Sequence, residues 1–300
     1  MKGHSLVAKT RPRILLLGST GQVGWELQRT LSPLGEVIAA SRDGNSGPVV
    51  DLSVPDSLVQ LFDEVRPNWV VNAAAYTAVD KAEQESDLAA AVNADAPAII
   101  GELASLLGAT VVHFSTDYVF DGKAQKPYRE GDTTAPLGVY GQTKLLGEQA
   151  LLDSGADALV LRTSWVYGRH GHNFLKTMLR LFQEREELSV VDDQIGSPTW
   201  SRMIAEATAQ ILAQLRLGQL GERRGIYHLT AAGQTSWYGF AKTILETSGE
   251  SCHLSPITTA DYPTPAVRPH WSVLDNSKLQ ETFGLTLPDW SVSLNHCLVD

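Results

Sequence analysis

A glycine-rich turn near the amino end constrains the fold of this chain more than any other feature. Gly18, Gly21 and Gly24 follow a short apolar run, Arg13–Leu17, and open a stretch with helical spacing of apolar residues. Glycine permits positive φ in a tight turn, and the free N–H groups at a helix start attract phosphate. We therefore expect a strand–turn–helix unit that holds the pyrophosphate of a dinucleotide. The alternative is an ordinary strand–turn–helix with convenient glycines.

The rest of the amino-terminal half alternates between short apolar runs and helical stretches. Such alternation predicts a parallel sheet with helices on both faces, because parallel neighbours need a crossover connection. The predicted strands are Arg13–Leu17, Glu36–Ala40, Trp69–Ala74, Thr110–Ser115 and Ala158–Thr163, and the predicted helices are Gln22–Leu31, Pro55–Val65, Ser86–Leu107 and Val139–Leu152. Pro97 falls inside the third helix and predicts a kink or a break there.

After about Trp165 the pattern loosens, which predicts a second, smaller unit. The expected elements are helices over Asn173–Glu184 and Met203–Leu215, strands over Leu188–Val191 and Ile226–Leu229, and an irregular tail over Ser255–Trp271. The fold class is α/β: a Rossmann-type doubly wound parallel sheet with a smaller C-terminal α/β substrate lobe. We expect a disordered leader over residues 1–12, the dinucleotide-binding domain over 13–165, and a mainly substrate-binding lobe over 166–300, with some of its segments returning to the main sheet.

Composition and charge narrow the class of protein. Of the 300 residues, 43% are hydrophobic and 19% are charged, which predicts a folded chain with a sizeable core. A formal net charge of -10 opposes binding to nucleic acid. Cys252 and Cys297 stand outside any metal-ligand pattern, which indicates thiols in a reducing compartment. We see no apolar stretch long enough to cross a membrane and no signal peptide, and we expect a cytoplasmic protein without a membrane partner.

Two residues with catalytic potential share a predicted helix. Tyr140 and Lys144 are four residues apart, so their side chains lie on one helix face. A carbonyl that accepts a hydride develops negative charge on its oxygen, and a phenol can supply the proton. A nearby ammonium would stabilise the phenolate and lower the pKa of the tyrosine. Chance spacing on a solvated helix is the alternative for this pair taken alone.

Two hydroxyl residues end the strand that precedes this helix. Ser115 and Thr116 stand at its carboxyl end, where ligands of open parallel sheets bind. We expect Thr116 to polarise a substrate carbonyl and Ser115 to face the cofactor. The alternative is that both hydroxyls form only local hydrogen bonds at the strand end.

The residues after the second strand bear on the choice of cofactor. An acidic residue there would bind the ribose hydroxyls of NAD, whereas an arginine accommodates the 2′-phosphate of NADP. Ser41 and Arg42 come first and Asp43 follows, so NADPH is the expected cofactor and NADH the alternative. Asp51 and Leu52 follow another short apolar pair and are expected beside the adenine. The small side chains of Ala73, Ala74 and Ala75, at the end of a strand, leave room for a flat ring or a ribose, and a tightly packed strand end is the alternative.

Seven stretches of the chain resemble one enzyme family. They read GSTGQVGWELQRTL, VVNAAAYTAVDKAE, STDYVFDG, APLGVYGQTKLLGE, RTSWVYG, NFLKTMLRL and PTPAVRPHWS. Together they run from about Arg13 to Trp290 and resemble the dTDP-4-dehydrorhamnose reductases, within the extended short-chain dehydrogenase/reductase superfamily. The resemblance implies NAD(P)H-dependent reduction of the C4 ketone of dTDP-4-dehydro-L-rhamnose. That step completes dTDP-L-rhamnose biosynthesis and serves polysaccharide biosynthesis.

The resemblance also implies roles for particular residues. The catalytic set is Thr116, Tyr140 and Lys144. The cofactor site comprises Gly18, Gly21, Gln22, Val23, Gly24, Asp51, Leu52, Ala73 and Ala74. The sugar-nucleotide site includes Val79, Asp80, Tyr118 and Trp165. To these we add Thr116 and Asp117 as substrate contacts, and Arg268, whose charge and loop setting suit the pyrophosphate of the substrate.

The sequence does not decide whether the chain has a metal site or forms a dimer. Some members of the family dimerise through a magnesium site made of carboxylates, for which Glu26, Asp192 and Asp193 are the candidates here. Ordinary surface acids are the other interpretation, and the sequence alone does not support Mg²⁺. His170 and His172 are interpreted as part of a solvated loop and not as metal ligands, because no third ligand stands nearby.

Two rival functions remain at this point. The first is another nucleotide-sugar enzyme of the superfamily, such as an epimerase or a 4,6-dehydratase, which keeps its NAD bound. A dehydratase needs an acid/base pair after the catalytic threonine, and here Asp117 is followed by Tyr118. The second is a non-catalytic NADP-binding regulatory subunit, which has no need of Tyr140 and Lys144.

Overall fold

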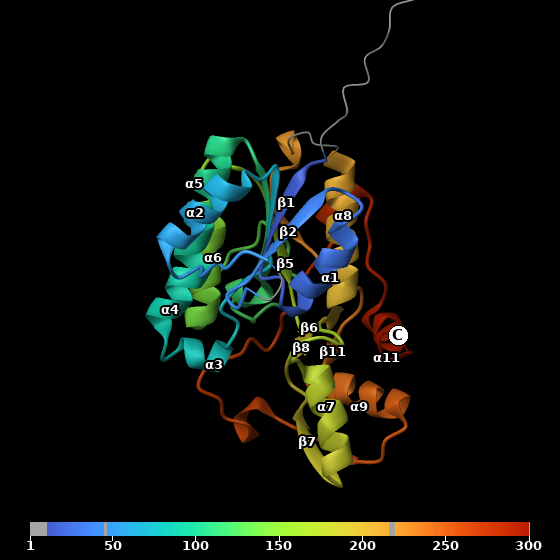
Figure 1. The fold of residues 1–300 in the computed structure, drawn as a ribbon. Helices are drawn as coiled ribbons and strands as arrows, with labels where there is room; N and C mark the ends of the chain where they lie inside the picture. The colour runs from blue at the N-terminus through green and yellow to red at the C-terminus, as the bar shows by residue number, and fades with distance from the viewer. Residues whose placement is uncertain (1–10, 45–46, 216–219, 300) are drawn as a thin grey trace, which may run out of the picture.

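The computed structural model describes residues 11–44, 47–215 and 220–299 (Figure 1). Its largest sheet has six strands in the order β2–β1–β3–β4–β5–β10, all paired in parallel, which confirms the predicted fold class. The strands are β1 Arg13–Leu17, β2 Glu36–Ala40, β3 Trp69–Asn72, β4 Thr110–Thr116, β5 Asp157–Thr163 and β10 Gly225–His228. The leader predicted over 1–12 falls almost entirely outside the described residues.

The register of this sheet brings the functional segments to one edge. Leu17 pairs with Ala40 on one side and with Asn72 on the other, and Asn72 pairs with His113. The strand order reverses beside β1, because β2 lies on one side of it and β3 on the other. The carboxyl ends of parallel strands open a crevice at such a point, and ligands bind there.

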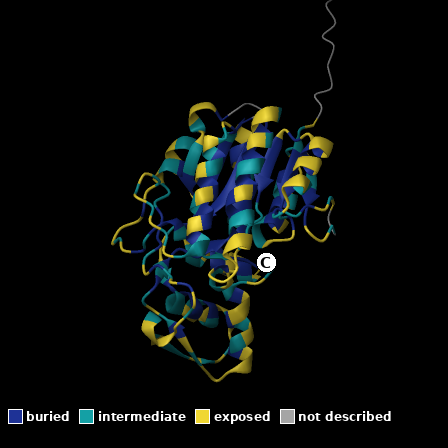
Figure 2. Ribbon diagram, turned by 90° about the vertical axis from the view of Figure 1, so that its left-hand side faces the viewer, coloured by how far each residue is buried: buried dark blue, intermediate teal, exposed yellow. Residues whose placement is uncertain are grey.

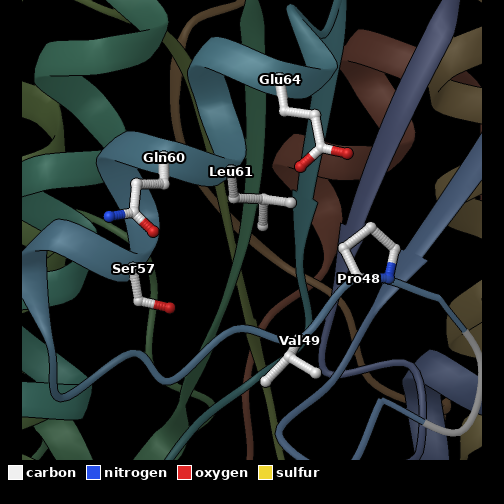
Figure 3. Close-up of a pocket in the computed structure, with 6 residues that line it drawn as sticks. All are labelled: Pro48, Val49, Ser57, Gln60, Leu61 and Glu64. Atoms are coloured by element: carbon white, nitrogen blue, oxygen red, sulfur yellow. The ribbon is translucent and has the colours of Figure 1, made fainter.

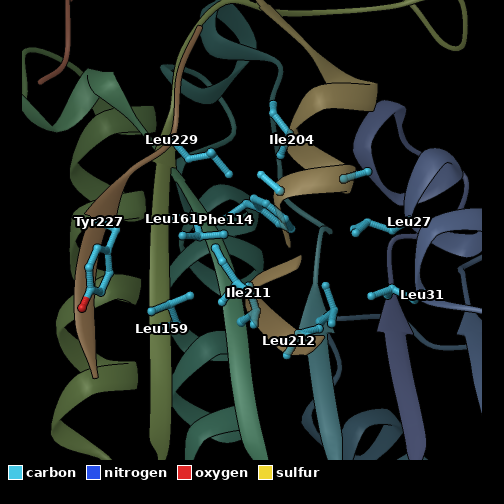
Figure 4. Packing of buried hydrophobic residues seen from close by; sticks show 14 of the residues in the cluster. Leu27, Leu31, Phe114, Leu159, Leu161, Ile204, Ile211, Leu212, Tyr227 and Leu229 are labelled. Atoms are coloured by element: carbon cyan, nitrogen blue, oxygen red, sulfur yellow. The ribbon is translucent and has the colours of Figure 1, made fainter. Parts of the chain in front are cut away.

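Helices cover both faces of the sheet, so the strands are buried on both sides (Figures 1 and 2). One layer contains α2 (Pro55–Val65), α5 (Ala96–Leu107) and α6 (Val139–Asp153), and the other contains α1 (Gln22–Leu31) and α8 (Ser201–Leu215). Alternate side chains of β1 serve the two layers: Ile14 and Leu16 pack into the α1/α8 layer, while Leu15 and Leu17 pack into the other. Figure 4 shows the α1/α8 layer.

The smaller unit has a core of its own beside the edge where the strands end. Two of its helices, α7 and α9, pack against each other through Met178, Phe182, Phe240 and Ile244. Its larger elements are α7 Phe174–Glu184, β7 Glu187–Val191, α9 Trp237–Ser248, β12 His253–Ile257 and α11 Trp290–Val299. Its short strands pair as β6 Val166–Tyr167 with β9 Thr199–Trp200, and β8 Ile195–Gly196 with β11 Thr235–Ser236.

Several predicted elements of this half are confirmed, and others were missed. The helices predicted over Asn173–Glu184 and Met203–Leu215 are α7 and α8, and the predicted strands are β7 and β10. The sequence did not predict α9, α11 or the short helix α10 (Ser277–Phe283). The tail predicted to be irregular from Ser255 is wrong at its start, because β12 pairs with β7 through Ile257. The domain division at residue 165 stays a prediction.

The helical stretch Ser86–Leu107 is interrupted, as Pro97 predicts. It consists of α4 (Ser86–Ala90), a π-helical turn over Ala91–Asp95, and α5, with Pro97 in the first turn of α5. Proline supplies no N–H to the preceding turn, and the wider π-turn accommodates that loss. By length and composition this stretch could cross a membrane, which the sequence analysis did not recognise. In the fold, α5 packs against α2 and α6.

Candidate active site

A groove of about 950 Å³ follows the carboxyl ends of the central strands. Its walls contain nearly every residue predicted to hold the cofactor; Gly24 is the one predicted residue that does not line it. The predicted residues that do line it are Gly18, Gly21, Gln22, Val23, Ser41, Arg42, Asp51, Leu52, Ala73, Ala74, Ala75, Ser115, Tyr140 and Lys144. The groove therefore joins the glycine turn to the Tyr–Lys pair.

The glycine turn leaves no room for side chains at two positions. Gly18 has φ +77, and a Cβ there would lie 2.6 Å from the backbone nitrogen of Ala74. A Cβ on Gly24 would lie 2.0 Å from the carbonyl oxygen of Gly18. Gly24 thus packs against the backbone of Gly18 and does not line the groove. The α1 helix begins at Gln22 without a side-chain cap, so its first N–H groups are available to a phosphate.

Lys144 is fixed by hydrogen bonds within the sheet edge. Its side chain is 1% exposed, its Nζ donates to the carbonyl oxygen of Phe114 at 2.7 Å, and it lies 3.1 Å from Nε2 of His113. The Nδ1 atom of His113 lies 3.1 Å from Nδ2 of Asn72. Burial lowers the pKa of Lys144 to about 8, although the carboxylate of Glu148 opposes this shift. Sequence reasoning missed His113, because it stands in an apolar strand with no motif around it.

Burial governs the pKa of Tyr140, which is raised to about 12; a hydrogen bond with Thr116 opposes the shift and the charge of Asp117 adds to it. The prediction that Lys144 lowers the pKa of Tyr140 is wrong for this arrangement, because burial raises that pKa and the hydrogen bond with Thr116 is the contact that opposes the shift. A phenol with a raised pKa stays protonated at neutral pH. The proton is therefore present on Tyr140, although the raised pKa makes the phenol a weaker acid than an ordinary tyrosine.

Thr116 links Tyr140 to a buried carboxyl group. The Thr116 hydroxyl donates to Oδ1 of Asp117 at 3.0 Å and accepts from the backbone N–H of Tyr118 at 3.2 Å. Asp117 is 2% exposed. Burial raises the pKa of Asp117 to about 7, against hydrogen bonds with Ser272 and Thr116 that favour the ionised form.

Several predicted substrate residues lie close to Tyr140, Thr116 and Asp117. Arg268 forms a two-point ion pair with Asp80, with distances of 3.0 and 2.7 Å from Nη1 and Nη2 to the carboxylate oxygens. That hydrogen bond is the main reason why the pKa of Asp80 is lowered. The ring of Tyr118 contacts the ring of Tyr140 edge-on, with 5.5 Å between centroids. Val79 begins the short helix α3 (Val79–Ala82), which also carries Asp80.

Trp165 is held in a strained backbone conformation. Its φ is +48, which is rare for a bulky residue and costs of order 1–3 kcal/mol. Its ring stacks on Trp237, with 3.5 Å between centroids and 4° between the planes. A Cβ on Gly196 would lie 2.4 Å from the indole of Trp165, so a glycine is needed at that position. No sequence pattern predicted Trp237 as a neighbour of Trp165.

The candidate magnesium ligands are not brought together. Glu26 is paired with Arg29 and Arg202, at 3.5 and 3.3 Å. Asp192 accepts a hydrogen bond from Ser236, and Asp193 accepts from Thr259. No group of three or more acidic, histidine or cysteine side chains forms a metal site within residues 11–44, 47–215 and 220–299. Within the described residues of one chain these carboxylates therefore form no metal site, and a magnesium site shared by two copies stays a prediction of the resemblance.

Residues 170–172 lie in a loop with His172 exposed, as predicted, but this loop also belongs to the candidate site. Gly171 and His172 line the groove, and His170 contacts the glycine turn. Asn93, in the π-turn, was also missed: its side chain accepts from the N–H of Tyr76 at 2.8 Å and donates to the Tyr76 carbonyl oxygen at 3.0 Å. Tyr76 lines the groove as well. Both features depend on contacts between segments that are far apart in sequence.

A second hollow lies outside the active site. It is lined by Pro48, Val49, Ser57, Gln60, Leu61 and Glu64, between α2 and the segment after β2 (Figure 3). Its volume is about 400 Å³, less than half that of the groove. It contains none of the residues predicted for catalysis or cofactor binding.

The fold and the groove define a Rossmann-type dinucleotide-binding protein with the Tyr–Lys pair of the short-chain dehydrogenases. The sequence pattern of one family, described as the RmlD substrate binding domain, matches residues 12–300. The chain belongs to that family.

Known relatives agree with this assignment. The chain is 46% identical over 298 residues to the dTDP-4-dehydrorhamnose reductase of Burkholderia thailandensis, covering 96% of this chain and 98% of the relative. It is 47% identical over 292 residues to the Escherichia coli K12 protein of the same name, covering 95% and 96%. The crystal structure of the Bacillus anthracis dTDP-4-dehydrorhamnose reductase in complex with NADP superposes with a TM-score of 0.88, at 34% identity, covering 97% of this chain and 99% of that one.

Proposed function

We propose that this protein reduces the C4 ketone of dTDP-4-dehydro-L-rhamnose to dTDP-L-rhamnose with NADPH, the final step of dTDP-rhamnose biosynthesis. The observation that carries the proposal is a single groove with the uncapped start of α1 in one part and Tyr140 and Lys144 in another. The relatives named above, similar over nearly their whole length, support the same activity.

The residues of the groove suit a reduced nicotinamide dinucleotide. The N–H groups at the start of α1 bind its pyrophosphate, and the missing side chains of Gly18 and Gly24 keep the turn close to it. The bound cofactor supplies a hydride. Arg42 is exposed at the groove wall, and its charge suits the 2′-phosphate of NADPH. The hydroxyl of Ser41 donates to Asp43 at 2.6 Å, which ties the nearest acid to a neighbour and favours NADPH over NADH.

Tyr140, Thr116 and Lys144 carry the proton chemistry. The Tyr140 hydroxyl donates its proton to the C4 oxygen as negative charge develops there. To polarise the same carbonyl, the Thr116 hydroxyl turns its single proton from Oδ1 of Asp117 to the C4 oxygen. Lys144, held at the sheet edge by its hydrogen bond to the Phe114 carbonyl oxygen, is placed to bind the ribose next to the nicotinamide.

The sugar nucleotide binds on the side of α3 and Arg268. We assign Val79, Asp80, Asp117, Tyr118 and Trp165 to its contacts. Arg268 uses three of its five donors on Asp80 and the Ala266 carbonyl, so two N–H groups remain for the pyrophosphate of the substrate. The ion pair with Asp80 thus positions the guanidinium without using all its donors.

A direct assay tests the proposal. Purified protein is mixed with dTDP-4-dehydrorhamnose and NADPH, and the absorbance of the reduced nicotinamide is followed, with NADH in a parallel reaction. Stoichiometric loss with NADPH, faster than with NADH, is the expected result. An epimerase or dehydratase would consume no added cofactor, and a regulatory subunit would bind NADPH without turnover. Location in the cytoplasm and assembly as a homodimer are further proposals, tested by cell fractionation and by the mass of the protein in solution.

A further inference from the structure

A loop from the smaller unit is fastened to the start of α1. The loop over residues 168–173 connects β6 to α7. The His170 Nε2 donates to the carbonyl oxygen of Thr20 at 2.9 Å, and its ring stacks on Trp25, with 5.1 Å between centroids and 8° between the planes. The Asn173 Nδ2 donates to Oε1 of Gln22 at 2.9 Å. Contacts at both ends of the loop therefore hold it against the glycine turn.

This arrangement places the next side chain of the loop in the cofactor groove. Gly171 has φ +75, which turns the chain between His170 and His172. A Cβ on Gly171 would lie 3.1 Å from Cγ of Gln22, so the loop is in van der Waals contact with the first residue of α1. His172 is exposed and lines the groove together with Gln22.

The distribution of charge explains why a donor is needed at this place. Among the described residues that line the groove, the basic ones are Arg42, Lys144 and His172, and the acidic ones include Asp43 and Asp51. Arg42 follows β2, at the adenosine end, and Lys144 is buried beside Tyr140, at the nicotinamide end. The phosphates between these ends would otherwise meet backbone N–H groups and uncharged side chains such as Thr20 and Gln22, in a protein with a net charge of -10.

We propose that His172 binds the pyrophosphate of the dinucleotide together with the N–H groups at the start of α1. The imidazole donates a hydrogen bond to a phosphate oxygen, and the contacts of His170 and Asn173 keep the loop in place. A residue of the smaller unit thereby completes the cofactor site of the larger one. This inference deepens the proposed function, because it rests on dinucleotide binding in the groove, but it does not depend on which sugar is reduced.

Binding measurements with fragments of the cofactor test the role of His172. Calorimetry compares wild type with His172→Ala for three ligands: NADPH, 2′-phospho-ADP-ribose, which keeps the pyrophosphate, and 2′-AMP, which lacks it. We expect the variant to bind the first two roughly 5- to 30-fold more weakly, as for the loss of a charge-assisted hydrogen bond at an exposed site. Its affinity for 2′-AMP should not change. His172→Lys should recover most of the affinity for the pyrophosphate ligands.

A matched control is His296→Ala, at an exposed position of α11, which should bind all three ligands like wild type. Unchanged NADPH affinity in His172→Ala would overturn the inference. An equal loss for 2′-AMP would also overturn it, because the effect would then not arise at the pyrophosphate. If wild type reduces the sugar normally and His172→Ala does not change NADPH binding, the inference about His172 fails while the proposed function stands. If the three ligands bind as expected but wild type does not reduce the sugar, the proposed catalytic function fails while the role of His172 stands.

Discussion

The two sides of the candidate active site are assembled from different kinds of parts. Around the glycine turn and Ala73–Ala75, the cofactor groove is formed by backbone and small residues at the ends of strands that pair in one sheet, and other side chains add to this frame. The proposed sugar side depends on side chains from remote segments, and Asp80 and Arg268 are 188 residues apart. A backbone site follows from local chain geometry, whereas a side-chain site needs the whole fold to place each group. Substitutions on the two sides should therefore produce separable defects.

The strongest test removes the proton donor where the two sides meet. Tyr140→Phe keeps the ring and its edge-on contact with Tyr118 but loses the hydroxyl. Turnover should fall by roughly 10²- to 10⁴-fold, the usual contribution of a general acid, with NADPH affinity unchanged. Tyr238→Phe, on α9, is the control and should keep normal turnover. Near-normal kcat in Tyr140→Phe would exclude the assigned role.

The buried Asp117 should make stability depend on pH in an unusual direction. Its pKa in the folded protein is raised to about 7, above the value near 3.8 for an ordinary aspartate. Between these values the folded protein holds a proton that the unfolded chain has released, so the free energy of unfolding falls as pH rises, by about 4 kcal/mol at most. Asp117→Asn cannot ionise and should not show this loss.

Thermal unfolding of wild type and Asp117→Asn across this pH range measures the difference. The Tm of wild type should drop relative to that of the variant as pH rises toward 7. Parallel pH profiles would mean that the carboxyl group is ionised throughout, and that the sugar side contains a stable buried negative charge.

The next test is confined to the backbone-built side. In Gly24→Ala the new Cβ would meet the carbonyl oxygen of Gly18, and the turn would have to shift. We expect NADPH binding to weaken about 10- to 100-fold, because crowding of this kind costs about 1–3 kcal/mol. Gly131→Ala is the matched control, since nothing lies within 4 Å of its Cβ position. Equal affinities in the two variants would show that the turn tolerates displacement.

The side-chain-built side is tested by Arg268→Lys. A lysine cannot reproduce the two-point pairing with Asp80 or the fork of donors offered to a pyrophosphate. The KM for the sugar nucleotide should rise about 5- to 30-fold, while the Kd for NADPH stays the same. Arg129→Lys, in an exposed ion pair with Asp275, is the control. A change in the Kd for NADPH would break the separation between the two sides.

The smallest expected effect concerns the loop that joins the cofactor side and the sugar side of the active site. Trp25→Leu removes the stack on His170 but leaves His170 free to bond to Thr20. NADPH binding should weaken by about 2- to 5-fold, the scale of one aromatic contact at a partly exposed site. Fluorescence titration measures this change. An affinity equal to that of wild type would show that the hydrogen bonds alone hold the loop.

The same contrast explains what could be predicted from the sequence. The strands β1 to β5 and the glycine turn were predicted because their signals are local: continuous apolar runs, glycine spacing and helix periodicity. The helix α11 has a weaker pattern, with few fully buried apolar side chains, and gave no comparable signal. The contact between His170 and Thr20 spans 150 residues, and no local pattern encodes it. Resemblance supplied Trp165 and Asp80, but not Trp237 or His113, which hold functional residues in place.

The return of α8 and β10 to the main sheet limits how this architecture can change. Ile204 and Ile211 of α8 pack against Leu27 and Leu31 of α1, and β10 covers the free side of β5. A chain cut after β6 would lose both, exposing an apolar helical face and an unpaired strand edge. The carboxy-terminal half therefore cannot be replaced as one continuous segment without damage to the main sheet. A new sugar specificity has to arise by replacing side chains and loops of the smaller unit, while α8 and β10 stay in place.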